Sequence, residues 1–302
     1  MKTWIYPLLV IIAASSYGVV STIIKLAMQK GFTASEAITG MFLIGFFLAF
    51  CIFVLINRGK LNFNGMKILV LAGVLTAVTN ILYSRSLIYV PASLAVVLLF
   101  QFTWIGMLIS CIAKRKLPSR IEFISLIVLF AGTIPAAGLI DVDLSQIPIQ
   151  GWLWGLAAAV CFSLFIYING KEIKGMGTSN RLLIVSLFAF ITTAILQSPE
   201  IIWNGTLFDE GLWIYGLALG LFGMIIPVFL FSLAIPRVGS GKSSILSAFE
   251  LPVAVTVSVL LLGESVTFLQ IAGIAVIIIG IGLPSIKWND KLLIKKAYKK
   301  YI

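Results

Sequence analysis

The sequence contains no histidine, and only 11% of its 302 residues are charged. The absence of histidine excludes imidazole-based catalysis, histidine metal ligands and histidine proton relays. The shortage of charge excludes an ordinary soluble domain, in which roughly 25% of residues are charged. The only cysteines, Cys51, Cys111 and Cys161, all fall in apolar runs. We interpret them as packing residues rather than as a disulfide framework or a metal site.

What the chain has in abundance is apolar sequence, since 60% of its residues are hydrophobic and its mean hydropathy is +1.11. A helix needs about 20 mostly apolar residues to cross the hydrocarbon core of a bilayer. Such runs recur along the chain and lack the alternation of transmembrane β-strands. We therefore predict an all-α integral membrane protein with ten transmembrane helices. The predicted spans are 4–28, 34–57, 66–88, 92–113, 120–140, 150–170, 180–198, 211–235, 242–262 and 267–285.

The basic residues indicate which helix ends face the cytoplasm. If the amino terminus is cytoplasmic and the spans alternate, all 22 lysines and arginines except Lys25, Lys30 and Arg85 fall on the inner side. The positive-inside rule favours this arrangement. It predicts a multi-pass protein of the cytoplasmic membrane with both termini in the cytoplasm, and it explains the net charge of +11 without a nucleic acid partner. We expect the first span to stay attached, because its apolar run is too long for a signal peptide.

The stretch Val238–Ile245, VGSGKSSI, looks like the end of a phosphate-binding P-loop. However, Pro236 occupies the place of the first glycine of that motif, and the residues before it belong to an apolar span rather than to a strand. We interpret the stretch as a turn between two membrane helices. Ser240 or Ser243 is expected to cap the second of them.

The two halves of the chain align when the sequence is shifted by 148 residues, as from Leu82 to Leu230. Each half holds five spans, so the second half enters the membrane from the opposite side. Such inverted repeats underlie alternating access in many secondary transporters. We predict two five-helix units, 1–145 and 146–286, followed by a basic cytoplasmic tail, 287–302. Other matching pairs are Ser84 with Ser232, Val90 with Val238, Leu98 with Leu246, and Gly132 with Gly280.

Three stretches resemble EamA-type transporters of the drug/metabolite transporter superfamily. ELPVAVTVSVLLLGESVTFLQIAGIAVIIIGI, which contains Pro252, Gly263 and Glu264, is similar to the end of an EamA unit. YSRSLIYVPASLAVVL is similar to the matching region of the first unit, and SYGVVSTIIKLAM resembles the first span. The resemblance implies ten helices, a central cavity and a solute carrier that is commonly an exporter. The halves are unequal, because Trp104 stands where the repeat predicts proline.

Glu250 is the strongest candidate for a functional residue. Most other acids have a structural explanation, such as the capping boxes that Glu36 and Glu122 complete. Glu250 lies about eight residues into the ninth span, roughly 12 Å deep. Pro252, a predicted helix break, removes one hydrogen bond and leaves a main-chain carbonyl free. A carboxyl group there could bind a proton, a cation or a substrate ammonium. The alternative is a carboxyl group that hydrogen-bonds to another helix.

Further polar residues in or near the spans are candidates for solute binding. Lys25 and Arg85 lie near the outer ends of their spans, where they either attract an anionic group or extend into water. The others offer hydrogen bonds or aromatic walls to a small solute, or else join membrane helices to one another. These are Asn80, Tyr83, Gln101, Trp104 and Asn169.

We predict a secondary active transporter that exports a small organic metabolite, an amino acid or a related compound, by alternating access. A proton or cation gradient, or the gradient of the solute itself, would drive it. The sequence lacks paired carboxylates, a metal-ligand cluster and a nucleophile–base set, so we expect neither an enzyme nor a cofactor or metal. The alternatives are a membrane receptor or scaffold and, less favoured, a membrane-embedded enzyme. The tail KWNDKLLIKKAYKKYI is expected to lie on anionic lipid, or else to bind a partner.

Overall fold

The computed structural model describes residues 5–57, 61–90, 92–138, 147–173, 175–197, 199–263 and 265–285. All regular structure in these residues is helical, which confirms the all-α prediction for the described part of the chain. The elements are α1 Ile5–Gln29, α2 Ala34–Asn57, α3 Met66–Ser86, α4 Ala92–Phe100, α5 Phe102–Lys114, α6 Arg120–Ala136, α7 Ile149–Asn169, α8 Thr178–Gln197, the 3₁₀ helix η3 Glu200–Ile202, α9 Leu212–Gly220, the π-helix η4 Leu221–Ile225, α10 Ile226–Val238, α11 Ser240–Ser247, α12 Glu250–Leu262, α13 Phe268–Gly282 and the 3₁₀ helix η5 Leu283–Ser285.

Eight helical segments in the described part of the chain are long and apolar enough to cross a membrane, so the protein is multi-pass. Three of them are composite: α4 with α5, α9 with η4 and α10, and α11 with α12. The fifth and tenth predicted spans form α6 and α13, which have 17 and 15 residues. Both are shorter than the roughly 20 residues that a span ordinarily requires. The total of ten spans therefore stays a prediction.

Capping boxes begin several of these helices. In the predicted box before α2, the main-chain N–H of Thr33 donates to Glu36 Oε2 at 2.7 Å, and the N–H of Glu36 donates to Thr33 Oγ1 at 3.2 Å. The predicted box formed by Ser119 and Glu122 begins α6 in the same way. Both predictions are confirmed. Each box satisfies N–H groups that the first turn of a helix leaves without a partner.

The P-loop-like stretch forms α11 and the turn before it. The expectation that Ser240 or Ser243 caps this helix is wrong, because the helix already begins at Ser240 and Gly239 is its N-cap. Gly239 has φ of 92°, a conformation that favours glycine. The small residues instead allow close packing on α5, since a Cβ atom on Gly241 would lie 2.9 Å from Met107 Sδ. The stretch is a helix-packing surface.

Helices from the first half of the chain pack mainly on helices from the second half. α1 packs on α10 and α12, α2 on α8 and α9, α3 on α7 and α8, α5 on α11, and α6 on α13. When the halves are exchanged, this pattern maps onto itself, since the pair α1–α10 becomes α7–α3. The α6–α13 contact is especially close: a Cβ atom on Gly273 would lie 2.7 Å from the main-chain oxygen of Gly132.

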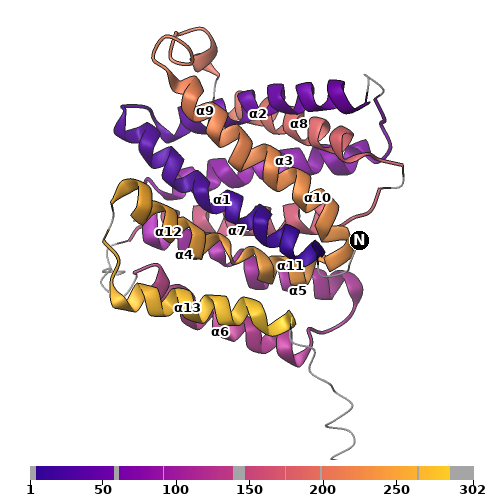
Figure 1. Cartoon of the computed structure of the whole chain (residues 1–302), viewed down its shortest axis with the longest axis vertical. Helices are drawn as coiled ribbons and strands as arrows, with labels where there is room; N and C mark the ends of the chain where they lie inside the picture. The colour runs from indigo at the N-terminus through magenta and orange to yellow at the C-terminus, as the bar shows by residue number, and fades with distance from the viewer. Residues whose placement is uncertain are drawn as a thin grey trace, which may run out of the picture.

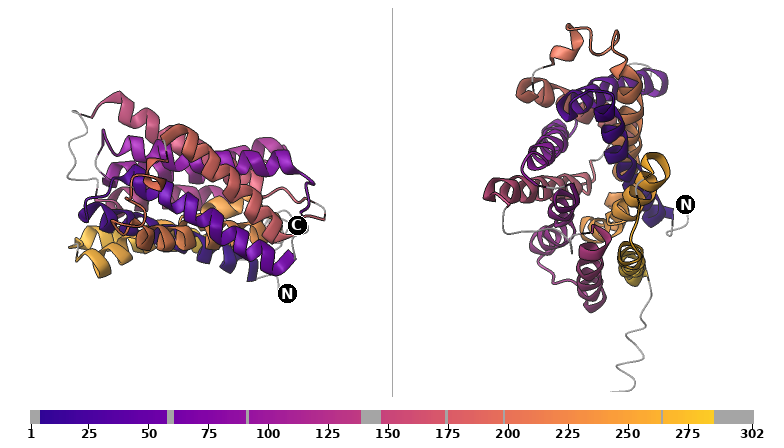
Figure 2. Two further views of the ribbon diagram at one scale, coloured as in Figure 1. Left: turned by 90° about the horizontal axis from the view of Figure 1, so that it is seen from above. Right: turned by 90° about the vertical axis from the view of Figure 1, so that its left-hand side faces the viewer.

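The helices run roughly along one direction, and most are therefore seen nearly end-on in the right-hand view of Figure 2. α1 begins and α13 ends at the same end of the bundle, together with the turns from α5 to α6 and from α7 to α8 (Figure 1). We call this the inner end. The segment that contains η3 projects at the opposite, outer end. The predicted tail, 287–302, lies outside the described residues.

Candidate functional site

The ninth predicted span is interrupted near its middle. α11 ends at Ser247 and α12 begins at Glu250, with two turn residues between them. In this turn, the N–H of Ala248 donates to the carbonyl of Ile245 at 3.1 Å, three residues back rather than four. The segment therefore consists of two shorter helices joined by a tightened turn.

Pro252 explains why the regular helix cannot continue through this point. It has no N–H to donate to the carbonyl of Ala248, four residues back. The sequence predicts that this carbonyl is left free, which is wrong, because it accepts the N–H of Leu251 at 3.3 Å. The three-residue bond satisfies the carbonyl by breaking the helix. Glu250 thus becomes the first residue of α12.

The Glu250 side chain is half-buried, and its Oε2 atom is enclosed without a hydrogen-bond partner. Glu250 sits near the middle of the segment Ser240–Leu262, about 15 Å from its start and about 18 Å from its end at 1.5 Å per residue. The partial positive charge at a helix start favours an anionic group there. An unpartnered carboxylate at this depth is nevertheless costly. The position is therefore suited to take up a proton or a cation.

Tyr17 of α1 belongs to the same site. The helices α1 and α12 meet at the next residue, where a Cβ atom on Gly18 would lie 2.5 Å from the main-chain oxygen of Glu250. The Tyr17 hydroxyl is enclosed without a hydrogen-bond partner and lies within electrostatic range of Glu250. Thr76 of α3 stands beside this hydroxyl and is only 2% exposed. Two packed helices thus bring two unpartnered polar groups into one site.

The helix α3 contributes a polar face to this site. Thr76, Asn80 and Tyr83 are spaced four and three residues apart, which places them on one side of the helix. Tyr83 lies within electrostatic range of Glu250. The Asn80 amide donates to the main-chain oxygen of Thr76 at 2.9 Å. Of the predicted site residues, the structure therefore brings Tyr83 near Glu250, with Asn80 on the same face of α3.

An aromatic cluster connects Glu250 and Tyr17 to a second interrupted span. The rings of Tyr17 and Phe162 meet edge to face at 5.7 Å, and those of Phe162 and Phe102 at 4.7 Å. Phe102 begins α5, directly after the interruption at Gln101 that separates α5 from α4. With the shift of 148 residues, Gln101 corresponds to Phe249 in the interruption of the ninth span. The fourth span of each half is thus broken at a corresponding position.

In the first half of the chain, side-chain hydrogen bonds rather than a proline accompany the interruption of the helix. The Gln101 amide donates to the main-chain oxygen of Val97 at 2.9 Å, and the indole N–H of Trp104 donates to Gln101 Oε1 at 2.8 Å. These two predicted site residues are therefore partners of each other. Trp104 occupies the proline position of the repeat, and it helps to hold the break that Pro252 forces in the second half.

The remaining predicted site residues lie apart from this cluster. Arg85 is exposed near the outer end of α3, with its guanidinium carbon 5.7 Å from the ring centroid of Trp154. Lys25 is half-buried in the outer part of α1. Asn169 is fully buried at the inner end of α7. The structure therefore divides the predicted set among the middle and the two ends of the bundle.

Three residues of interest are not singled out by the sequence. Tyr17 and Thr76 are polar side chains inside apolar spans, but nothing in the sequence links them to Glu250. The sequence places Arg181 on the inner side by its charge, at the start of the predicted span 180–198, and the structure shows it in α8 with only 5% of its surface exposed. A basic residue at the inner side of a membrane can thus fold inward when a neighbouring helix end needs donors.

The fold and the site define a multi-pass helical membrane protein with an unpartnered carboxyl oxygen enclosed midway along a broken helix. The chain belongs to the EamA-like transporter family, whose model matches residues 4–136 and 149–286. The expectation from the sequence resemblance is therefore confirmed, and the protein is a membrane transporter.

Similar proteins are consistent with this assignment. The chain is 25% identical over 287 residues to the threonine/homoserine exporter RhtA of Escherichia coli (strain K12), a match that covers 92% of this chain and 90% of the relative. The protein of that name from Salmonella typhimurium (strain SL1344) matches with the same identity and coverage. A solved crystal structure has a similar fold, with a TM-score of 0.71, 15% identity, and coverage of 94% of this chain and 96% of that chain.

Proposed function

We propose that this transporter exports a small amino acid, or a closely related metabolite, by alternating access between two inverted five-helix units, 1–145 and 146–286. Two features support the repeat. The family model matches one segment in each unit, and the helix pairs correspond when the halves are exchanged. The matching interruptions at Gln101 and at Ala248–Phe249 add a third. In this arrangement, the two units rock against each other and open the site to one side at a time.

The proposed location is the cytoplasmic membrane, with ten spans and both chain termini in the cytoplasm. The shared inner end of α1 and α13 supports this topology (Figure 1), as does the concentration of basic residues in the loops predicted to be cytoplasmic. The tail 287–302 then lies beside the inner leaflet, where its six lysines would contact anionic lipid.

The enclosed, unpartnered Oε2 atom of Glu250 carries the proposal. A charged carboxylate is costly to enclose at this depth, whereas a neutralised one is not. The two units can therefore switch readily only when Glu250 holds a proton or a cation, which can be the ammonium group of the cargo. When the site then opens to one side of the membrane, the proton or cation bound to Glu250 can be released there. This requirement couples the gradient of one species to the movement of the other.

The proposed cargo follows from the site and from the relatives. An amino acid carries an ammonium group that Glu250 can bind, and the hydroxyl groups of Tyr17, Thr76 and Tyr83 can bond its polar atoms. The similar proteins from the two bacteria are named as threonine/homoserine exporters. L-Threonine is therefore the first compound to test, and a proton is the first coupling ion.

Transport by purified protein in vesicles tests the role of Glu250. Replacing Glu250 with Gln keeps the shape of the side chain but removes its titratable proton. We expect a pH gradient to drive L-threonine movement with the natural protein, and the rate to fall at least about 100-fold in E250Q with folding retained. Glu210→Gln, an exposed acid at the outer end, is the matched control and should transport normally.

Two results would contradict the proposal in different ways. Normal gradient-driven transport by E250Q would remove Glu250 from the mechanism while leaving a transporter. Binding of amino acids without flux in the natural protein would instead favour a receptor.

A further inference from the structure

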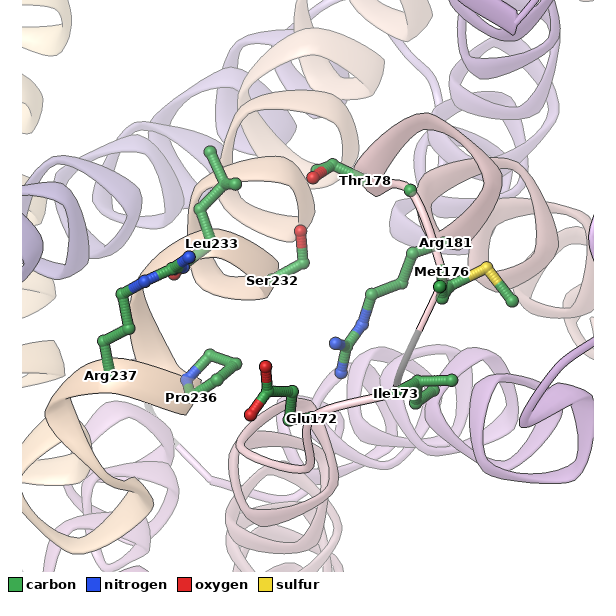
Figure 3. A pocket seen from close by; sticks show the side chains of 11 residues that line it. Glu172, Ile173, Met176, Thr178, Arg181, Ser232, Leu233, Pro236 and Arg237 are labelled. Atoms are coloured by element: carbon green, nitrogen blue, oxygen red, sulfur yellow. The ribbon is translucent and has the colours of Figure 1, made fainter.

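A cavity of about 500 Å³ lies at the inner end of the bundle, away from Glu250. It is lined by the turn between α7 and α8, the first turn of α8 and the last turns of α10 (Figure 3). Its volume falls in the range of roughly 300–1,000 Å³ that is typical of small-molecule sites. Its walls carry three charged side chains, Glu172, Arg181 and Arg237. A charged cavity in a chain so poor in charge calls for a chemical explanation.

Arg181 supplies a fixed positive charge in one wall. Its guanidinium donates to the main-chain oxygens of Asn169 at 3.0 Å and of Lys171 at 3.3 Å. These carbonyls end α7, so the arginine caps a helix whose partial negative charge is only about half an electron. The Nε–H group is buried without an acceptor. Both the charge and the hydrogen-bonding capacity of Arg181 are therefore incompletely satisfied by the protein.

Arg237 supplies a second positive charge from α10. Its guanidinium donates to the main-chain oxygen of Leu233 at 2.7 Å and lies 4.8 Å from the ring centroid of Tyr6. The aromatic face holds the guanidinium in place without neutralising it. Within the described residues, the hydrogen bonds of both arginine side chains end on main-chain carbonyl oxygens rather than on carboxylates.

Glu172 provides the opposite charge between the two arginines. Figure 3 shows its carboxylate directed into the cavity, with Arg181 on one side and Arg237 on the other. The Ser232 hydroxyl, which donates to the main-chain oxygen of Phe229 at 2.8 Å, keeps its acceptor capacity. The walls thus offer two guanidinium groups, one carboxylate and a hydroxyl to a ligand.

We propose that this cavity captures the cargo from the inner side, as a free α-amino acid whose carboxylate lies between Arg181 and Arg237 and whose ammonium faces Glu172. This inference rests on the proposed function and adds a loading site to it. A dicarboxylate would bring a second negative charge against Glu172, so the wall selects against it. A simple amine would meet two positive charges. Only a ligand with both groups complements both kinds of charge.

Substitutions of the two exposed charges test the loading site. Glu172 and Arg237 are exposed, so changing them costs little stability, whereas Arg181 caps α7 and is left intact. In vesicles loaded with L-threonine, we expect E172Q and R237Q each to raise the KM for export at least about tenfold with little change in maximal rate. Arg120→Gln at the same end and Glu210→Gln at the outer end are matched controls and should keep the natural KM.

A second measurement separates recognition from a general structural effect. Direct binding to the detergent-solubilised protein is measured for L-threonine and for 3-hydroxybutanoate, which lacks the amino group. E172Q should weaken the binding of L-threonine at least about tenfold without weakening that of 3-hydroxybutanoate. R237Q should weaken both.

The outcomes distinguish this inference from the proposed function. Natural KM values in both variants, beside active export, would overturn the loading site and leave the transporter intact. Absence of flux in the natural protein would overturn the proposed function. In that case, L-threonine binding that E172Q weakens would still support the cavity as a binding site, and absence of such binding would overturn it as well.

Discussion

At the scale of single residues, the hydroxyl of Tyr17 is the group whose role is easiest to isolate. Its ring packs against Phe162 and Phe231, while its oxygen is enclosed without a partner. A buried hydroxyl without a hydrogen bond costs about 1–3 kcal/mol. This hydroxyl lies within electrostatic range of the unpartnered Glu250 carboxyl oxygen. A hydrogen bond that formed to either group during transport would remove part of this energetic cost.

Tyr17→Phe removes this hydroxyl and leaves the ring in place. We expect the variant to be as stable as the natural protein, or more stable by up to about 1–3 kcal/mol, because the unpartnered group is gone. If the hydroxyl bonds to Glu250 or to the cargo during the cycle, the transport rate should fall by about tenfold. Thermal unfolding in detergent and flux in vesicles measure the two effects. A stable variant with an unchanged rate would show that the hydroxyl plays no part in transport.

The candidate site is only partly predictable at this scale. Glu250 stands out because it is an acid in the middle of an apolar run, and that signal is local. The nearness of Tyr17 depends on Gly18, which allows α1 to meet the start of α12, and such pairings across the chain leave no mark in a single sequence. Asn169 and Arg85 are also polar residues in apolar spans, so the sequence alone cannot show that they lie away from Glu250.

At the scale of helices, the sequence locates the elements but not their interruptions. Apolar runs and capping boxes are local features, so the predicted spans agree closely with the helices. The break at Ala248–Phe249 is suggested by Pro252. The corresponding break at Gln101 has no proline and depends on hydrogen bonds from the Gln101 and Trp104 side chains. The π-helix η4 likewise depends on tertiary contacts, such as the Ser16 hydroxyl that donates to the main-chain oxygen of Phe222 at 2.6 Å.

The contact between α6 and α13 yields a prediction at this scale. A Cβ atom on Gly273 would lie 2.7 Å from the main-chain oxygen of Gly132, and main-chain atoms cannot yield as a flexible side chain does. We expect Gly273→Ala to destabilise the protein by about 1–3 kcal/mol.

Gly282→Ala is the matched control, because it lies in the same helix and a Cβ atom there meets nothing within 4 Å. It should be neutral or stabilising by about 0.5–1 kcal/mol. Unfolding of both variants in detergent measures the difference. Equal stability of the two would show that α6 and α13 can separate without cost.

At the scale of the whole molecule, the charge distribution predicts how the bundle sits in the membrane. With the native cysteines replaced, Leu117→Cys places a thiol in the exposed turn between α5 and α6 at the inner end, and Trp203→Cys places one in the exposed segment at the outer end. In intact cells, an impermeant maleimide should label the Trp203 position and not the Leu117 position. Labelling of Leu117→Cys from outside would reverse the topology, and labelling of both would contradict the alternating spans.

The main-chain contact between Gly132 and Gly273 also bears on how movement spreads through the bundle. Figure 1 places α6 and α13 along one edge of the molecule and α2 along the far edge. Two helices in main-chain contact cannot slide along each other. The pair would therefore act as the pivot about which the other helices rotate. Displacement increases with distance from a pivot, so a slight rotation beside α13 would become a large displacement at α2 and α9. The lipid in contact with that edge would be displaced the most.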